Sequence, residues 1–305
     1  MSIRRGRLIE RAVIGTAPRD LKGDIRMKTM TCTAIAAALV LALPGCNQQE
    51  AADTNEGAAT EVAAADLSAL SGTWKTDKDS LKFEQKPDEF ALKDGTYSCT
   101  TCIPPLTVAA DGQFHDVTGR PYADSISVNA ADDKTIEIHS KKGGKEVSSL
   151  TMSVSADGTS LTRKFHDATV NPAVDGTSTA TRAGPAPAGA HAASGQWTPD
   201  KLNEYPDEAL NTTYKIEGDT VNSTYQGQTY TAELGGPAVP IQGDIGGTTV
   251  AVSREGNGLK ETFSREGKVV GELVTTISAD GNSITWVNID PRDGSKVSGT
   301  ANKTN

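Results

Sequence analysis

The sequence is poor in aromatic residues and lacks the motifs of the common enzyme classes. It has 3 Trp, 6 Tyr and 5 Phe among 305 residues. It contains no Gly-x-Ser-x-Gly, His-Glu-x-x-His, Walker or Gly-x-Gly-x-x-Gly motif, so none of the chemistries that these motifs serve is indicated. Its 30 glycines and frequent Thr and Ser are typical of small β domains rather than of one large enzyme core. We expect no catalytic residues and no cofactor.

Basic residues are also scarce once the N-terminal segment is set aside. Residues 1–45 hold eight of the 30 Lys and Arg and three of the 39 Asp and Glu, a net charge of +5. Residues 46–305 hold the other 22 basic and 36 acidic residues, a net charge of −14. Phosphate backbones and anionic lipid surfaces repel such a charge. We therefore expect no nucleic-acid partner.

The N-terminal segment has the pattern of an export signal. A basic start at Met27-Lys28 precedes an apolar run over residues 34–43, which is too short to span a bilayer. The run ends in Leu43-Pro44-Gly45-Cys46, which resembles the lipobox of bacterial lipoproteins apart from its Pro. An ordinary secretory signal with an incidental cysteine is the alternative.

The lipobox resemblance implies cleavage before Cys46, diacylation of its thiol and acylation of the new N-terminus. Several acyl chains anchor a protein durably, whereas a single chain binds only marginally. Asn47, not Asp, follows the cysteine, which in this family implies transfer to the outer membrane. We expect a protein of the bacterial cell envelope, lipid-anchored to the outer membrane on its periplasmic side.

Composition divides the chain further. Residues 1–26 precede the export signal, and we expect them to be an extension from a start codon placed too early, with 27–45 as the signal peptide. Residues 46–67 are polar, acidic and rich in Ala, which is typical of a disordered tether. Residues 185–193 are rich in Pro, Gly and Ala and predict a linker.

The segments on either side of this linker repeat one another. Two patterns recur with an offset of 123 residues: SGTWKTDK at 71–78 as SGQWTPDK at 194–201, and SADG at 155–158 as SADG at 278–281. Two domains of one fold are predicted, over residues 68–184 and 194–305.

Each repeat shows the alternation of an antiparallel β domain. In the first, Leu150, Met152 and Val154 alternate with polar residues and lead to the turn at Asp157-Gly158. An Asp-Gly turn between alternating segments predicts a hairpin. About seven or eight short strands per repeat indicate a small barrel or sandwich.

The start of each repeat adds a family resemblance. The Gly-x-Trp motifs at Gly72 and Trp74 and at Gly195 and Trp197, each followed by hairpins, resemble the start of a lipocalin-type barrel. The resemblance implies an all-β fold of two tandem small antiparallel barrels, and the lipobox with two such repeats is similar to uncharacterised bacterial outer-membrane lipoproteins. We expect each Trp to fill one end of a core and each Gly to allow close approach. A Trp that stacks on a ligand is the alternative.

Two further cysteines, Cys99 and Cys102, lie between Tyr-Ser and Ile-Pro-Pro. In an exported chain, cysteines this close are expected to be oxidised. A redox-active pair normally lies at a helix N-terminus, whereas this context predicts a turn between strands. We expect a structural disulfide, with thiol exchange and metal binding as alternatives.

A zinc site would have to add histidines to these cysteines. The candidates are His115, His139 and His166. The separation between His115 and His139 does not fit a zinc finger, and the second repeat has no histidine at the equivalent positions. We expect no metal.

Three functions fit these observations. The first is a non-catalytic envelope lipoprotein that binds the membrane through its lipid anchor. Its β domains bind a small apolar or glycan ligand. The second is an assembly module that contacts other envelope proteins through its sheet edges. The third is a periplasmic enzyme or thiol-exchange factor. We favour them in this order.

Overall fold

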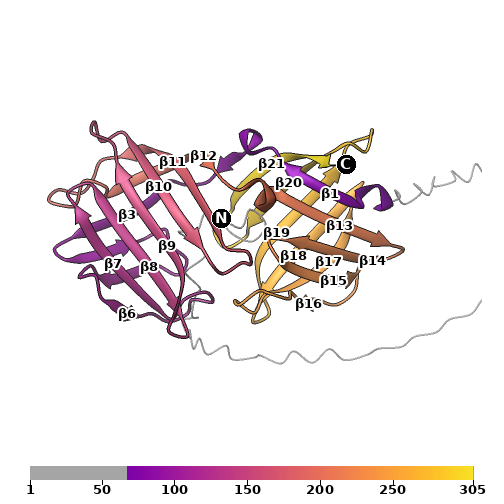
Figure 1. The fold of residues 1–305 in the computed structure, drawn as a ribbon, viewed down its shortest axis with the longest axis horizontal. Coiled ribbons are helices and arrows are strands. Elements are labelled where there is room, and N and C mark those ends of the chain that lie inside the picture. The colour runs from indigo at the N-terminus through magenta and orange to yellow at the C-terminus, as the bar shows by residue number, and fades with distance from the viewer. Residues whose placement is uncertain (1–66, 305) are drawn as a thin grey trace, which may run out of the picture. The chain divides into compact units, whose positions relative to one another are not determined.

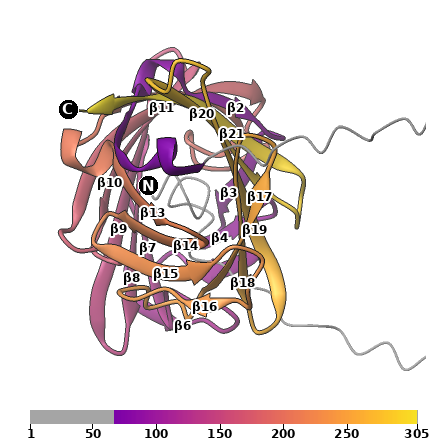
Figure 2. The same cartoon turned by 90° about the vertical axis from the view of Figure 1, so that its right-hand side faces the viewer.

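The computed structural model describes residues 67–304, which form two nearly closed antiparallel β-barrels (Figures 1 and 2). The predicted all-β fold of two tandem barrels is confirmed. The expected extension, the signal peptide, Cys46 and the tether up to residue 66 lie outside the described residues. Within these residues, no helix has the length and apolarity of a membrane span.

Barrel 1 is a 10-stranded sheet. In sheet order its strands are β5 (Leu106–Ala109), β4 (Thr96–Cys99), β3 (Asp88–Lys93), β12 (Gly195–Glu204), β11 (Val174–Gly184), β10 (Ser160–Asp167), β9 (Lys145–Val154), β8 (Thr135–Lys142), β7 (Ser125–Asp132) and β6 (Phe114–Asp116). The two ends of the sheet approach each other beyond β5, where the Gly112 amide donates to the Val128 carbonyl at 2.9 Å.

Barrel 2 is an 11-stranded sheet. In sheet order its strands are β15 (Gln228–Glu233), β14 (Thr220–Tyr225), β13 (Asn211–Glu217), β1 (Gly72–Thr76), β21 (Ser295–Thr304), β20 (Ser283–Asp290), β19 (Lys268–Ile277), β18 (Gly258–Arg265), β17 (Thr249–Glu255) and β16 (Val239–Pro240), with β2 (Lys82–Glu84) also pairing with β21. A bridge between Thr229 and Gln242 nearly closes the sheet. Three 3₁₀-helices complete the structure: η1 (Leu67–Leu70), η2 (Lys78–Ser80) and η3 (Asp207–Leu210).

The first strand of each repeat lies in the barrel that the other repeat forms. β1, from the first repeat, pairs with β13 and β21 of the second, and β12 pairs with β3 and β11 of the first. In Figure 1, violet β1 lies among the orange and yellow strands of barrel 2. The repeat boundaries at 68–184 and 194–305 therefore do not coincide with the barrels, contrary to the expectation of one folded domain per repeat.

Chain connectivity explains this exchange. β11 ends at Gly184 and β12 begins at Gly195, so the two strands pair across a short connection. β1 is separated from β11 by about 100 residues. Closing the shorter loop costs less conformational entropy, and strands that follow one another usually pair. β12 thereby occupies the place beside β11, and β1 occupies the equivalent place between β13 and β21.

The two cores bury different polar groups although they share one fold. In barrel 1, Trp197 pairs with Asp88, whose carboxylate accepts a hydrogen bond from the buried Arg163 guanidinium at 3.3 Å. In barrel 2, Trp74 pairs with Thr212 in the same register. Asp88 of barrel 1, a member of an ion pair, is therefore replaced in barrel 2 by the hydroxyl residue Thr212.

Barrel 2 has its own buried carboxylate. Glu261 is 0% exposed, and its two oxygens accept hydrogen bonds from the hydroxyls of Tyr214 and Tyr230 at 2.8 and 2.7 Å. The strand registers place apolar residues at the three equivalent positions of barrel 1: Phe90, Leu106 and Ile138. These polar groups follow no repeat and distinguish one core from the other.

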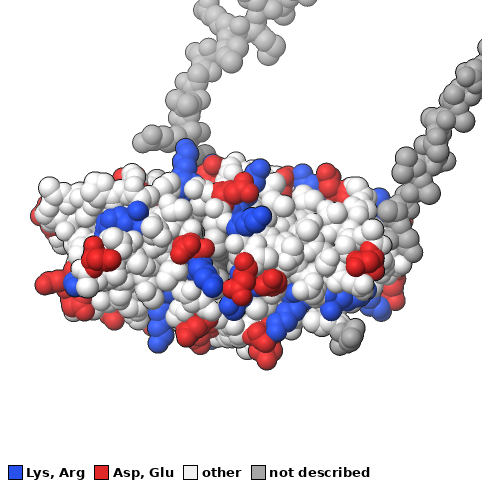
Figure 3. All heavy atoms as spheres, turned by 90° about the horizontal axis from the view of Figure 1, so that it is seen from above, with Lys and Arg blue, Asp and Glu red and all other residues white. Residues whose placement is uncertain are grey.

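The outer surface carries charged side chains, and the strands at the sheet edges are short. Figure 3 shows basic and acidic side chains interspersed over the face that it presents. The terminal strands β6 and β16 have 3 and 2 residues, and β5 and β15, at the other ends of the two sheets, have 4 and 6. Short edge strands offer few free backbone groups to another chain.

Candidate functional site

Both tryptophans of the Gly-x-Trp motifs are buried in the barrel cores. Trp74 and Trp197 are each 0% exposed, and their Nε1 atoms donate to the carbonyls of Leu70 and Ala193 at 2.8 and 2.9 Å. The cavity beside Trp74 has a volume of about 20 Å³, which is room for one water molecule. This geometry fits a structural role better than ligand stacking.

A cation near the end of each repeat covers each of these rings. Arg182 lies 4.0 Å from the centre of the Trp197 ring, and its guanidinium also donates to two backbone carbonyls. Lys303 lies 5.1 Å from the Trp74 ring and donates to one backbone carbonyl at 3.1 Å. Sequence comparison missed this pair because Arg182 and Lys303 are 121 rather than 123 residues apart.

The glycines of the motif make room for these cations. Gly72 and Gly195 have φ angles of 137° and 128°, which favour glycine. A Cβ atom at either position would lie 2.7 Å from the side chain of Lys303 or Arg182. In each Gly-x-Trp motif, the Gly leaves space for the cationic side chain that lies over the Trp ring two positions later.

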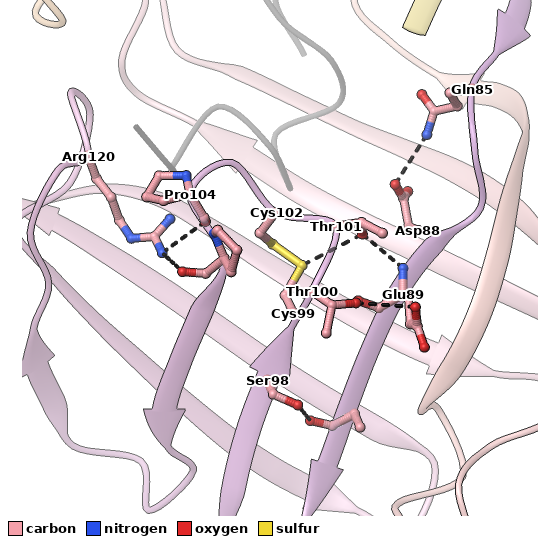
Figure 4. Close-up of a disulfide and its surroundings, with 12 residues drawn as sticks. Gln85, Asp88, Glu89, Ser98, Cys99, Thr100, Thr101, Cys102, Pro104 and Arg120 are labelled. Atoms are coloured by element: carbon pink, nitrogen blue, oxygen red, sulfur yellow. Dashed lines mark hydrogen bonds between the residues drawn. A yellow bond between two sulfur atoms is a disulfide. The ribbon is translucent and has the colours of Figure 1, made fainter. Parts of the chain in front are cut away.

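Cys99 and Cys102 form a disulfide at the end of β4 (Figure 4). The turn that they close is held to β3, because the Thr100 amide donates to the Glu89 carbonyl at 3.1 Å and the Glu89 amide donates to the Thr101 hydroxyl at 2.9 Å. Both cysteines are buried, and no helix begins at this turn. This is the setting of a structural disulfide rather than of a reactive thiol.

The segment after the disulfide holds Arg120. Its guanidinium donates to the carbonyls of Pro104 and Pro105 at 3.4 and 3.3 Å (Figure 4). Arg120 is 6% exposed, and this desolvation lowers the pKa of its guanidinium to about 10. Arg120 therefore remains charged at neutral pH.

The histidines do not gather into a metal site. Three of them interact at 2.8 to 2.9 Å with three different carboxylates: His115 with Asp111, His139 with Glu146 and His166 with Asp175. Residues 67–304 contain no group of three or more His, Cys, Asp or Glu side chains that could hold a metal ion.

A cleft of about 680 Å³ lies between loops of the two barrels. Barrel 1 lines it with the β6–β7 loop and the end of β8: Gly119, Arg120, Pro121 and Lys142. Barrel 2 lines it with the β16–β17 loop, the β18–β19 turn and the β20–β21 turn: Ile245, Gly246, Gly247, Arg265, Glu266, Lys268, Val269, Val270 and Arg292. Its volume is that of a typical small-molecule site.

Tyr122 joins the two barrels beside this cleft. Its hydroxyl donates to Asp244 at 2.8 Å and accepts a hydrogen bond from Arg265 at 3.1 Å. Its ring packs against Gly246, where a Cβ atom would lie 2.5 Å from the ring. Burial raises the pKa of Tyr122 although Arg265 opposes the shift, so the hydroxyl stays protonated as a donor at neutral pH. Arg265 is held further by Thr248 at 3.0 Å.

The charged side chains of the cleft are mostly cationic. They are Arg120, Lys142, Arg265, Lys268 and Arg292 against the single acid Glu266. Arg292 forms an ion pair with Asp290 at 2.6 Å. Lys142 and Lys268 form no ion pair with any residue in the described range. In a chain whose residues 46–305 carry −14, this cluster concentrates positive potential and attracts anions.

Apolar surface accompanies the charge. Among residues 67–304 only three large hydrophobic side chains are exposed, and two of them, Ile245 at 45% and Val269 at 40%, line the cleft. The third, Phe114, is covered by the Lys141 ammonium at 3.7 Å from its ring. The cleft can therefore meet both a charged and an apolar group.

Equivalent segments of the two repeats form the cleft. Lys142 and Arg265, which both line it, are 123 residues apart. Tyr122 and Gly246, which contact each other, are 124 residues apart, and contact between equivalent positions is typical of twofold-related interfaces. Lys142 and Arg265 precede the same turn in the two repeats, so the sequence alone could have indicated these two basic residues of the cleft. Arg120 and Arg292 have no basic counterpart, so nothing in the repeat indicated them.

Comparison of the sequence with protein-family models and with curated proteins finds no match to either.

Proposed function

We propose that the protein is a non-catalytic lipoprotein of the bacterial envelope that binds a small ligand in the cleft between its barrels. The cleft carries this proposal, since it has the size of a ligand site, five cationic side chains and two exposed aliphatic side chains. The cavity beside Trp74 admits only a water molecule, which favours a site between the barrels over one inside that core. The lipobox at Leu43-Pro44-Gly45-Cys46 supports the anchor.

An assembly module that pairs its sheet edges with other envelope proteins has less support. At the ends of the two sheets, β6 and β16 have 3 and 2 residues, β5 has 4, and β15 has 6 but is bridged to Gln242 at Thr229. β-Augmentation draws its affinity from a row of backbone hydrogen bonds, and these short or bridged strands offer few. The cleft is the larger feature and decides our preference.

Native mass spectrometry of protein purified from its own cells tests the ligand. We expect the wild type to carry a small-molecule adduct that is lost when Lys142 and Lys268 are both replaced by Gln. The matched control replaces Lys164 and Lys296, two exposed lysines outside the cleft, and should retain the adduct. An adduct that survives the cleft variant would place the ligand elsewhere.

Metabolic labelling with an alkyne fatty acid tests the anchor. The wild type should take up the label, and Cys46→Ser should not, because the thiol is the acyl acceptor that the lipobox implies. Cys32→Ser, in the expected signal peptide, is the matched control and should be labelled like the wild type. Label on the Cys46→Ser protein would rule out a lipid at this thiol.

A further inference from the structure

Resting on the proposed function, we infer that the ligand is a small anionic amphiphile with a doubly charged head group of the phosphate monoester type. Lys142 and Lys268 bind the head group, and Ile245 and Val269 contact its aliphatic part. Both pairs of side chains line the one cleft.

The charge of the lining favours a multiply charged head group. Arg292 is neutralised by Asp290, and Arg265 donates to the hydroxyls of Thr248 and Tyr122, the second of which donates in turn to Asp244. Lys142 and Lys268 add two more charges without ion pairs in the described range. The cleft lining holds a single carboxylate, Glu266, against these two lysines.

A phosphate group suits such a set of donors. Its oxygens accept charge-assisted hydrogen bonds from several ammonium and guanidinium groups at once, and these are the strongest hydrogen bonds in proteins. A neutral glycan would leave the lysine charges uncompensated.

The aliphatic part follows from the two exposed side chains. Ile245 and Val269 are 45% and 40% exposed, and among residues 67–304 only one other large hydrophobic side chain, Phe114, is exposed. A hydrocarbon segment against them would remove apolar surface from water, and each methylene buried is worth about a fourfold gain in affinity. The cleft volume of about 680 Å³ limits the ligand to a head group with a short chain.

Calorimetric titration of the full mature chain tests this inference with three probes below their micellar concentrations. Octyl phosphate carries the charge and the chain, octyl glucoside carries the chain alone, and inorganic phosphate carries the charge alone. We expect octyl phosphate to bind at least about tenfold more tightly than either single-feature probe, and more weakly at high salt. Octanoate, with one charge, should bind less tightly than octyl phosphate.

Variants assign the binding to the cleft. Lys142→Gln with Lys268→Gln should weaken octyl phosphate by about tenfold or more while octyl glucoside is unchanged. Ile245→Ser with Val269→Ser should reduce octyl phosphate binding toward that of inorganic phosphate. Lys164→Gln with Lys296→Gln should match the wild type, which separates a local effect from a change in net charge.

The outcomes separate the inference from the proposed function. Equal affinity for octyl glucoside and octyl phosphate, with the serine variants weakened, would overturn the charged head group and leave the cleft as a ligand site. Equal affinity for inorganic phosphate and octyl phosphate would overturn the aliphatic part. If both cleft variants bind every probe with the affinity of the wild type, the inference and the proposed function are overturned together. Displacement of octyl phosphate by vesicles that contain phosphatidic acid would identify a membrane lipid as the source, and no displacement a free amphiphile.

Discussion

In the core of barrel 1, the Arg163 guanidinium donates to the Asp88 carboxylate across 3.3 Å, with side chains only 1% and 7% exposed. Asp88 also accepts a hydrogen bond from Gln85 at 3.1 Å. Strand register places Thr212 and Trp286 at the equivalent positions of barrel 2. One fold therefore accepts either an ion pair or an uncharged pair at this depth.

Breaking this ion pair should be costly, whereas replacing it by the barrel 2 residues should cost less. Arg163→Met leaves Asp88 buried without its cation, and we expect a loss of about 3–5 kcal/mol in the free energy of unfolding. Asp88→Thr combined with Arg163→Trp removes both charges and should recover part of that loss. Guanidinium unfolding of the full chain, followed by circular dichroism, measures both. A double variant as unstable as the single one would mean that charge compensation is not what the pair provides.

The strand exchange predicts which fragments fold. Residues 88–204 contain every strand of barrel 1, β3 to β12, in one uninterrupted segment. Expressed alone, this fragment should give a β-type spectrum and a cooperative melt. Residues 68–184, expressed alone, lack β12 of barrel 1, and residues 194–305 lack β1 and β2 of barrel 2, so each should melt at lower temperature or without cooperativity.

Mixing the last two fragments is the sharper measurement. Residues 68–184 supply β1 and β2 to barrel 2 and residues 194–305 supply β12 to barrel 1, so the two fragments should associate and regain the melt of the intact chain. Size-exclusion chromatography then reports a complex. Two separate fragments that melt like the intact protein would mean that β1 and β12 return to their own repeats.

Removing the disulfide should weaken barrel 1 modestly. Cys99→Ser with Cys102→Ser opens a very short loop, and chain entropy gives about 2 kcal/mol for such a loop. Because the next residues hold Arg120 through Pro104 and Pro105, octyl phosphate binding should weaken as well. Chemical unfolding and calorimetric titration measure the two effects, and reductant should act on the wild type but not on the variant. If reductant changes neither the stability of the wild type nor its octyl phosphate binding, both expected effects of the disulfide are contradicted.

The turn at Asp157 predicts a dependence of stability on pH. Hydrogen bonds, first from the Ser155 hydroxyl and then from Thr159, lower the pKa of Asp157 to about 2 from 3.8. Since the pKa is lower in the folded state, the contribution is present above about pH 4 and is lost as the pH falls toward 2. Asp157→Asn should therefore lose less stability than the wild type over this interval, as measured by melting temperature. Parallel curves for the two proteins would contradict the assignment, and Asp280, whose pKa Ser278 lowers in the same way, is the matched site in barrel 2.

The strands could be predicted because their signals are local. Leu150, Met152 and Val154 alternate with polar residues in β9, and the turn at Asp157-Gly158 leads into β10. Burial alternates along these strands as the sequence indicates. The disulfide was equally local, since three positions separate its cysteines.

The exchange and the cleft are not local, and the sequence alone did not reveal them. β1 and β12 carry the same Gly-x-Trp pattern and fit either place, so only the length of the connections decides between them. The cleft draws Arg120 and Lys142 from one barrel and Arg265 and Arg292 from the other. Only the strand pairing brings these distant positions together.

The exchanged strand also decides how the protein would bear force. The described residues begin with η1 and β1, and β1 belongs to barrel 2, the barrel made mostly by the second repeat. If Cys46 carries the lipid that we propose, a force along the chain from the membrane reaches β1 of barrel 2 before it reaches the strands of barrel 1. β1 is paired on both sides, with β13 and with β21, and a pull along its axis loads those hydrogen bonds in shear. With such an anchor, the strand exchanged between the repeats would also be the first strand to bear the force.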